Sequence, residues 1–366
     1  MTSRERMLTA LANERPDRMP CQVHGWMDHY LNHYLGGIDG WQAYERFGMD
    51  YAIYVSPAYR YDDVDLAKWE IRTEDLSAND EGARLHRIEI KTPEGTLTKK
   101  TVTSEITVYD SEHLLKSDRD IELFLTYYPV PVAVDFDPIQ QAKERLGDRG
   151  IIRSHPFSPG QGSPWPSFCT LYGTEQAILL GMDRPDFLKE ILDSVLEKTL
   201  RVTQMWEGTP ADMVEVGGGA GSSTVISPAF YREFGLPYDQ RQNELFHRAG
   251  VKVVNHFCGG VMPMLDLVVE SDADGLETMT PAGMGGDCDL AEASRRVGAE
   301  LFFIGGFDQN AGFEHGTPDA ARRLVFECFE ATKDHAGYIC CPSDHFFHGS
   351  PENLQAFADA CRECEY

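Results

Sequence analysis

The sequence predicts an α/β protein with the architecture of a (β/α)₈ barrel, or TIM barrel, for two reasons. Eight short apolar runs lie along the chain, and longer amphipathic stretches separate them. Strands that alternate with helices form a parallel sheet, and eight such units can close into a barrel. The chain has 366 residues, which single barrels commonly reach, so we expect one domain over residues 1–366.

The first predicted element is a helix that ends before Pro16. Thr2 is followed three residues later by Glu5, which is a capping-box pattern, and apolar residues from Met7 to Leu11 follow at helical spacing. The eight predicted strands come after it, in this order: Arg18–His24, Asp50–Ser56, Ile151–Phe157, Met213–Gly217, Val251–Cys258, Gly275–Met279, Leu301–Phe307 and Tyr338–Pro342.

A β-hairpin is predicted as an insertion after the second strand, within about residues 60–148. Residues Leu85–Lys91 and Thr96–Val102 alternate polar and apolar side chains around the turn sequence Thr92-Pro93-Glu94-Gly95. Insertions mostly decorate a fold. We therefore expect this one to cover an end of the barrel or to contact a second copy of the chain in a homodimer.

The charge of the chain excludes one class of partner. With 33 Lys+Arg against 59 Asp+Glu, the formal net charge is −26. Nucleic-acid binding depends on basic residues that displace phosphate counterions, and no basic run is present to supply them. We therefore expect no nucleic-acid partner and no anionic membrane surface.

A cytoplasmic location is expected from two further features. No window approaches the length of a membrane-spanning apolar segment, and residues Met1–Arg6 open a helix instead of a signal peptide. The nine cysteines are an odd number and are scattered, which is not typical of a disulfide framework. Reduced thiols, some of them metal ligands, are the better interpretation.

Candidate catalytic residues lie where the predicted strands end, because the carboxyl ends of barrel strands carry the active site. Three of these residues are predicted to be catalytic, namely His24, Glu215 and Asp308, and Glu277 in the sixth strand is predicted to bind substrate.

The segment Asn255-His256-Phe257-Cys258-Gly259-Gly260 gives the sharpest prediction. Residues two apart on a strand point to the same face, so the imidazole of His256 and the sulfur of Cys258 are expected to converge. Nitrogen and thiolate sulfur suit zinc, and three protein ligands with one open position form a catalytic zinc site. The alternative is a buried thiol beside a core histidine.

The third zinc ligand is expected at the end of the eighth strand, which is adjacent to the first strand in a closed barrel. Asp344 lies just beyond Pro342 and is the preferred ligand, with Cys341 and His345 as alternatives. Cys340 and Cys341 can also fill the barrel interior as small hydrophobic residues.

Two other segments are predicted to shape a substrate site. The glycine run from Gly217 to Gly221 lacks the G-x-G-x-x-G spacing of a dinucleotide fingerprint, so it predicts a tight loop that leaves room for a substrate at Gly218. The stretch around Trp26 and Tyr30 is rich in aromatic residues and histidines. It predicts either a pocket for a flat apolar ligand or an ordinary helix packed on the barrel.

Taken together, many segments make the chain resemble the uroporphyrinogen decarboxylase superfamily. They are Thr2–Arg6, Pro16–Pro20, Ile226–Pro228, Pro237-Tyr238, Gly250–Gly260, Gly305–Asp308, Gly316–Pro318, Gly337–Pro342 and Pro351–Asn353. The resemblance covers nearly the whole chain and implies a distorted (β/α)₈ barrel. It also implies one of two activities, because the superfamily contains decarboxylases and corrinoid-dependent methyltransferases, among them coenzyme M methyltransferases and O-demethylases of methoxylated aromatics.

The residues favour the methyltransferase branch. Decarboxylases of this superfamily bind porphyrinogen carboxylates through arginines soon after the first strand, and the stretch from Cys21 to Glu45 contains no arginine. The methyltransferases carry a His-x-Cys zinc motif on the fifth strand, which His256 and Cys258 match, and a cysteine after the eighth strand. Here Asp344 stands in place of that cysteine; an aspartate oxygen can also bind zinc.

The resemblance therefore implies a zinc-dependent methyltransferase of a corrinoid system. Zinc would activate the oxygen of a methoxylated aromatic donor or the sulfur of a thiol acceptor. The chain has no D-x-H-x-x-G cobalamin motif, so the corrinoid must arrive on a separate partner protein. The alternatives are a metal-independent decarboxylase in which Asp344, Asp308 or Glu215 is the acid or base, and a catalytically inactive barrel that binds a partner.

Overall fold

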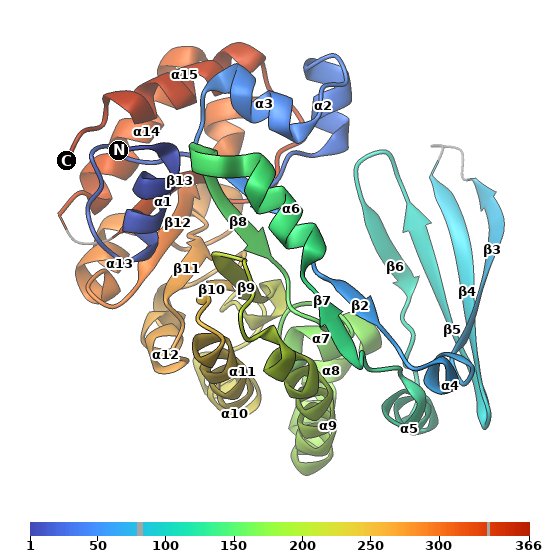
Figure 1. Cartoon of the computed structure of the whole chain (residues 1–366). Coiled ribbons are helices and arrows are strands. Elements are labelled where there is room, and N and C mark those ends of the chain that lie inside the picture. The colour runs from blue at the N-terminus through green and yellow to red at the C-terminus, as the bar shows by residue number, and fades with distance from the viewer. Residues whose placement is uncertain (79–82, 335–336) are drawn as a thin grey trace.

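In the computed structural model, which describes residues 1–78, 83–334 and 337–366, a curled sheet of seven parallel strands forms the centre of the molecule (Figure 1). Its strands neighbour one another in the order β1 (Tyr51–Tyr54), β8 (Gly150–Ser154), β9 (Met213–Gly217), β10 (Lys252–His256), β11 (Gly275–Thr278), β12 (Phe302–Phe307) and β13 (Tyr338–Pro342). These are the second to eighth predicted strands, most of them shorter than predicted.

The first predicted strand, Arg18–His24, is wrong as a strand of this sheet. It is an extended segment that lies between the edge strands β13 and β1, with one parallel bridge from Cys21 to Cys340. The N–H of Gln22 donates to the carbonyl of Cys340 at 3.0 Å, and the N–H of Asp50 donates to the carbonyl of Cys21 at 2.9 Å. Pro20 has no N–H to donate, which limits the ladder at this position.

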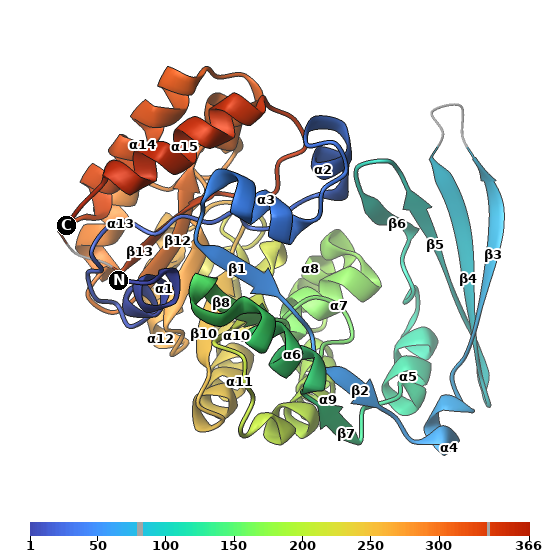
Figure 2. The same cartoon turned by 45° about the horizontal axis from the view of Figure 1, so that its top comes forward.

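Helices are arranged around the outer side of the sheet, and the long pair α14 and α15 pack side by side (Figures 1 and 2). Their bounds are α1 Ser3–Leu11, α2 Asp28–Tyr34, α3 Gly40–Phe47, α6 Asp137–Leu146, α7 Pro164–Tyr172, α8 Thr174–Asp183, α9 Pro185–Thr203, α10 Pro228–Phe234, α11 Leu236–Arg248, α12 Leu265–Glu270, α13 Leu290–Val297, α14 Pro318–Thr332 and α15 Pro351–Glu363. The predicted capping box at Thr2 and Glu5 is formed. None of the helices in the described residues is both long and apolar enough to cross a lipid bilayer.

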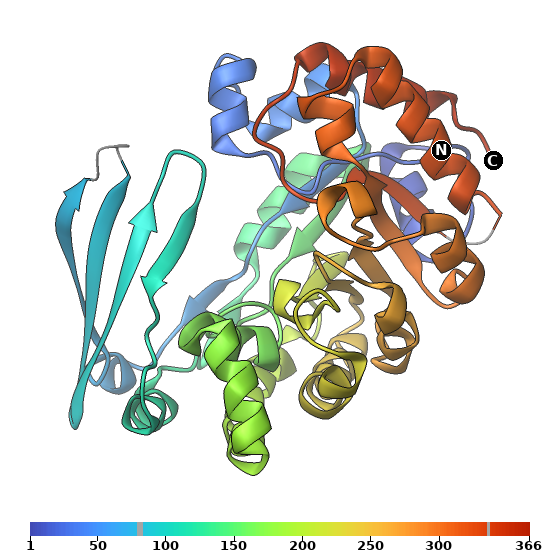
Figure 3. The same cartoon turned by 180° about the vertical axis from the view of Figure 1, so that it is seen from behind.

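The insertion is larger than the predicted hairpin. Strands β4 (Arg84–Thr92) and β5 (Gly95–Thr103) form that hairpin, and β3 (Glu70–Ala78) and β6 (Val108–Glu112) extend it to a four-stranded antiparallel sheet. This sheet stands beside the curled sheet (Figure 3). Helices α4 (Asp63–Leu66) and α5 (Asp118–Tyr127) and the antiparallel pair β2 (Ala58–Arg60) and β7 (Ala133–Asp135) connect it to the rest.

The interior of the curled sheet has an apolar layer and a polar layer. Residues two apart on a strand share a face. Apolar side chains from the strands, among them Ile151, Met213 and Val254, therefore form one buried cluster with Met7 and Leu11 of α1. Towards the carboxyl ends of β1, β8, β9, β10 and β11, the same face carries polar side chains: Tyr54, Arg153, Glu215, His256 and Glu277.

Candidate active site

A cavity of about 510 Å³ opens at the carboxyl ends of the strands. It is lined by His24, Gly25, Tyr54, His155, Gln161, Glu215, His256, Cys258, Asp344 and His345. The fold therefore brings to one cavity the predicted residues His24, Glu215, His256, Cys258, Asp344 and His345.

Beneath the cavity, a buried arginine links two carboxylates. Nη2 of Arg153 lies 3.0 Å from Oε2 of Glu215 and also forms an ion pair with Glu277. The side chains of Arg153 and Glu277 are fully buried, and the guanidinium lies over the Tyr54 ring at 4.5 Å. The Tyr54 hydroxyl donates to Glu215 at 2.5 Å. Burial alone would raise the pKa of Glu277, but the charge of Arg153 and the hydrogen bond from His256 lower it to about 2.

His256 is oriented by Glu277, its register partner on the neighbouring strand. Its Nδ1 lies 3.0 Å from Oε1 of Glu277 and 3.5 Å from Oε1 of Glu215, so Nδ1 carries the hydrogen and donates it. Burial alone would lower the pKa of His256. The hydrogen bonds with Cys258 and Glu277 and the charges of both glutamates outweigh burial and raise this pKa well above its usual value.

Glycines let the loop after β9 approach Cys258. A Cβ on Gly219 would lie 2.8 Å from the Cys258 sulfur, so only glycine fits without displacing the thiol. Gly218, predicted to bind substrate, instead donates its N–H to the carbonyl of His256 at 2.9 Å. A Cβ at Gly218 would lie 2.8 Å from Oε1 of Gln161. The glycine run therefore positions the residues of the site, and a substrate contact at Gly218 stays a prediction.

The predicted zinc ligands were Asp344, His256 and Cys258, but the structure does not group Asp344 with the other two. Ligand atoms of Asp344, His345 and His24 lie within 4.8 Å of one another, and His24 also joins Glu215, His256 and Glu277 in a second such group. Burial is the main cause that lowers the pKa of His24 well below its usual value, and the charges of His256 and Arg153 act in the same direction. His24 is therefore a neutral imidazole between the two groups.

The buried group of His24, His256, Glu215 and Glu277 could hold a metal ion such as zinc, and Cys258 belongs to neither of the two groups. Arg153 supplies one positive charge against the two carboxylates of Glu215 and Glu277, so the network lacks one positive charge. A proton on His256 supplies it, and so would a divalent zinc ion together with the thiolate of Cys258. Metal-bound histidines typically donate their other ring N–H to a carboxylate, which is the arrangement of His256 and Glu277.

Besides Gly218, five of the predicted residues lie outside the lining of this cavity. Trp26 stacks on Phe47 at 5.9 Å, and Tyr30 stacks on Tyr34 at 4.9 Å in the same aromatic cluster. Asp308 accepts a hydrogen bond from the N–H of Ala311 at 2.9 Å. Cys341 is buried in the apolar interior layer. Glu277, predicted to bind substrate, is fully buried and acts through His256 and Arg153.

The sequence reasoning missed Arg153, Tyr54, His155 and Gln161. Arg153 and Tyr54 lie on predicted strands, and the two-residue alternation from Ile151 and Ala52 places them on the interior face. That alternation is the signal that would have found them. His155 follows β8 but lies within the predicted strand Ile151–Phe157, where the same alternation assigns it to the interior face; Gln161 is in the loop after β8, where strand periodicity gives no prediction.

The backbone is strained beside the site, at the end of β11. Thr278 and Met279 have φ of 77° and 45°, which is costly for a β-branched residue such as threonine. The Thr278 hydroxyl donates to the carbonyl of Phe257 at 2.8 Å and helps to hold the turn. Strain of this kind concentrates at functional sites.

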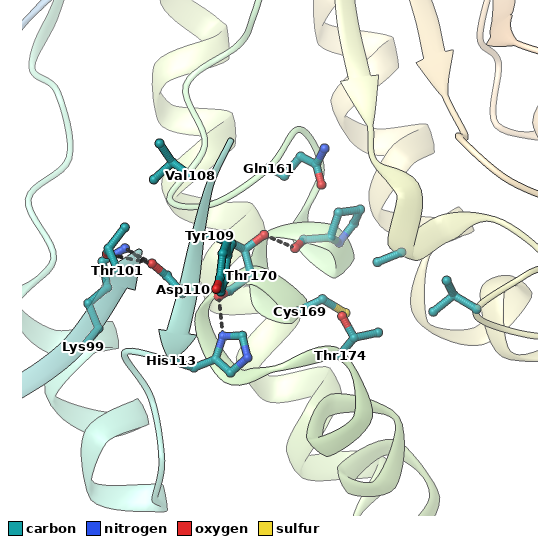
Figure 4. A pocket seen from close by; sticks show the side chains of 13 residues that line it. Lys99, Thr101, Val108, Tyr109, Asp110, His113, Gln161, Cys169, Thr170 and Thr174 are labelled. Carbon is teal, nitrogen blue, oxygen red and sulfur yellow. Dashed lines mark hydrogen bonds and ion pairs between the residues drawn. The ribbon is translucent and has the colours of Figure 1, made fainter. Parts of the chain in front are cut away.

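A second cavity, of about 550 Å³, lies between the inserted sheet and helices α7 and α8 (Figure 4). Its walls include Lys99 and Asp110, which form an ion pair at 2.9 Å, and His113, whose Nδ1 lies 3.2 Å from the carbonyl of Thr170. Gln161 lines both cavities. The loop after β8 therefore separates the two cavities.

Among solved structures, the chain is similar to a methyltransferase from Methanosarcina mazei. The two share 16% identity with a TM-score of 0.66, and the match covers 99% of each chain. At this identity the likeness shows a shared fold.

Curated relatives of similar sequence are uroporphyrinogen decarboxylases. One from Neisseria gonorrhoeae is 28% identical over 185 residues, which is 49% of this chain and 49% of the relative. One from Xanthomonas euvesicatoria pv. vesicatoria is 28% identical over 197 residues, 51% and 52% of the two chains. The chain thus matches about half the length of these relatives. The model of the uroporphyrinogen decarboxylase family matches residues 130–364, so the chain belongs to this family.

Proposed function

We propose that this chain is a zinc-dependent methyltransferase of a corrinoid system. It would move a methyl group from a methoxylated aromatic compound, or a similar methyl donor, to a corrinoid carried by a separate protein. One observation carries the proposal: the cavity places a carboxylate-oriented imidazole, His256, and a thiol, Cys258, on one wall. These are the ligand types of a zinc site with an open position.

The chemistry divides between the metal and the residues of the chain. Zinc bound there would supply a Lewis acid that stabilises the oxygen or sulfur partner as an anion. Glu277 fixes the imidazole of His256 through Nδ1, and Arg153 forms ion pairs with both glutamates and lowers the pKa of Glu277. The ether carbon–oxygen bond breaks with both electrons left on oxygen, the methyl group passes to the reduced acceptor as a methyl cation equivalent, and the phenolate takes up one proton.

The charge and shape of the cavity support a small aromatic donor over a substrate with many carboxylates. No lysine or arginine lines the cavity in the described part of the chain, whereas Glu215 and Asp344 do. A polyanionic substrate would meet these carboxylates without a free cation to bind it. The rings of Tyr54 and His155 line the cavity and stack at 4.8 Å, which offers a flat surface to an aromatic ring.

The test combines metal analysis with a transfer assay. The purified protein should carry zinc, and methyl transfer from methoxyarenes to a corrinoid protein should fall by about 10²-fold or more in His256→Ala and Cys258→Ala, because the activating ion is lost. Cys288→Ser is the matched control, since Cys288 is another half-buried thiol and lies outside the cavity lining. Full transfer in both cavity variants contradicts the proposal.

A metal-independent decarboxylase is the second candidate, and the family match favours it. Glu215 and Asp344, both in the cavity lining, would then serve as acid and base. Release of CO₂ by protein treated with a chelator, unchanged in Cys258→Ala, would support this candidate over methyl transfer.

A further inference from the structure

We infer that the chain has a second metal site, formed by His29, His33 and Glu105, which takes a divalent transition-metal ion such as zinc and clamps the inserted sheet to the barrel. The two histidines are on α2, one helical turn apart. Glu105 lies in the turn between β5 and β6. Figures 1 and 2 show that turn beside α2.

The spacing of the Glu105 oxygen from each histidine nitrogen matches a coordination shell. Nε2 of His33 lies 3.0 Å from Oε1 of Glu105, and Nδ1 of His29 lies 3.3 Å from the same oxygen. All three ligand atoms are within 4.8 Å of one another. Ligands that are each about 2.0–2.2 Å from a metal ion in a tetrahedral or octahedral shell lie about 3.0–3.5 Å apart.

The hydrogen bonds of His33 favour a metal ion at this point. Its Nδ1 lies 2.9 Å from the carbonyl of His29, so Nδ1 carries the hydrogen and donates it. In the neutral ring Nε2 then presents a lone pair to a carboxylate oxygen. Two facing lone pairs repel, and a cation between them removes the repulsion. Backbone carbonyls commonly fix metal-binding histidines in this way.

His29 supplies an independent observation. Its side chain is only 9% exposed, and its Nδ1 forms no hydrogen bond although it points at Glu105. An unpaired buried nitrogen costs free energy. Coordination to a metal would satisfy this atom. The rings of His29 and His33 stack at 4.2 Å, and their ligand nitrogens lie within 4.8 Å of each other and of the Glu105 oxygen.

A clamp here would control the second cavity. Strand β6, which follows Glu105, contributes Val108, Tyr109 and Asp110 to the wall of that cavity. Helix α2 begins four residues after His24, which lines the first cavity. A bound ion would therefore fix the inserted sheet relative to both cavities. Imidazole and carboxylate ligands suit zinc, nickel and cobalt, and calcium is disfavoured because it prefers oxygen.

The test uses the full chain without the proposed zinc ligands His256 and Cys258; the group of Asp344, His345 and His24 remains, and the variants of His33 and Glu105 distinguish its binding from that of the second metal site. A His256→Ala/Cys258→Ala variant, stripped with a chelator, should bind one equivalent of Zn²⁺ in calorimetry. Adding His33→Ala or Glu105→Gln should weaken this binding about 100-fold. His86→Ala is the matched control, because His86 forms a similar exposed pair with Asp75 on the inserted sheet, at 2.7 Å. Hydrogen exchange should show the β5–β6 turn more protected when zinc is present.

Cobalt separates this site from the one at His256. Co²⁺ bound by imidazole and carboxylate lacks the thiolate charge-transfer absorption that Cys258 would give. The absorption spectrum of the unmodified chain therefore distinguishes cobalt at one site from cobalt at the other. The inference is overturned if the His256→Ala/Cys258→Ala variant binds no zinc, or if His33→Ala and Glu105→Gln bind it as tightly as that variant.

Discussion

Arg153 is the residue on which the electrostatics of the candidate site depend. It is fully buried, one nitrogen bonds both Glu215 and Glu277, and its Nε and Nη1 have no hydrogen-bond partner in the described structure. The cation is therefore held by two carboxylates and by the face of Tyr54. Removal of one partner from such a group is costly, since the remaining charge stays buried.

Glu277→Gln tests this dependence. The change leaves Arg153 with one carboxylate and replaces the charged acceptor of His256 with a neutral amide oxygen, so we expect a loss of about 3–5 kcal/mol in the free energy of unfolding. Denaturant unfolding measures the loss, and zinc affinity should fall about 10- to 100-fold in parallel. Glu89→Gln on the inserted sheet is the control and should change neither quantity. A stable Glu277→Gln protein with normal zinc affinity would contradict the role given to Glu277.

The buried carboxyl of Asp239 leads to a second prediction, which concerns how the free energy of unfolding depends on pH. Burial raises its pKa from 3.8 to about 6, although hydrogen bonds from Tyr231 and Ser163 oppose the shift. A carboxyl with a raised pKa in the folded state destabilises the fold once it ionises. The free energy of unfolding should therefore fall by about 3 kcal/mol as pH rises from 3.8 to 6.

Asp239→Asn should remove that loss of stability, because the amide does not ionise. Its oxygen can still accept the hydrogen bond from the Tyr231 hydroxyl, which is 2.6 Å long in the parent chain. We expect the variant to be more stable than the parent at pH 7.5 and similar to it near pH 4. Urea unfolding at the two pH values measures the difference. Parallel stability curves for parent and variant across this range would show that Asp239 does not titrate as described.

At the scale of elements, the loop after β9 is fitted to the thiol of Cys258. Gly219→Ala places a methyl group 2.8 Å from the sulfur. Either the thiol of Cys258 or the backbone at residue 219 must then shift. We expect a loss of about 1–3 kcal/mol in stability from this overpacking and weaker zinc binding.

A double-mutant cycle isolates that contact. In a Cys258→Ala background the sulfur is absent, so Gly219→Ala should cost less than in the parent, and the two costs should differ by more than about 0.5 kcal/mol, the limit within which independent sites add. Thermal unfolding of the four proteins gives the coupling energy. Equal costs in the two backgrounds would mean that the cost of the alanine is unrelated to the Cys258 sulfur.

The strands were predictable where burial on both faces made a continuous apolar run. Strands β9 and β13 have the predicted bounds, because their residues are almost all buried. Strands β3 and β6 were not predicted as strands, since Ile71 and Val108 are exposed and their neighbours are charged or polar. The segment before His24 is apolar and extended, but the sequence could not show that it would make only one parallel bridge, from Cys21 to Cys340, beside the sheet.

The sequence could predict residues of the site only where they lie at the ends of predicted strands. Strand ends placed His24, Glu215, His256 and Cys258 at one cavity. The side-chain partners were not predictable, because they depend on the register between neighbouring strands. His256 pairs with Glu277 in that register, so Glu277 became a positioning residue. The segment around Trp26 has the composition of a ligand site, but Trp26 itself packs against Phe47 in the core.

At the scale of the whole molecule, the net charge of −26 is the dominant feature. The ion pairs of the inserted sheet and the helices are mostly exposed, for example Arg72 with Glu70 and Arg248 with Glu244. Exposed pairs contribute little to stability. They cannot offset the mutual repulsion of the unpaired carboxylates, because a large net charge of one sign opposes the compact state.

Salt should therefore stabilise this protein. The Debye length falls from about 30 Å at 0.01 M to about 10 Å at 0.1 M, so added salt screens repulsion between distant carboxylates more than attraction within a contact pair. We expect the melting temperature to rise by a few degrees between about 0.01 and 0.3 M NaCl and then to level off. The measurement is made with a chelator present, so that metal binding does not contribute, and choline chloride should give the same rise at equal ionic strength. A melting temperature that falls as NaCl is added would mean that surface ion pairs outweigh the excess of 59 acidic over 33 basic residues.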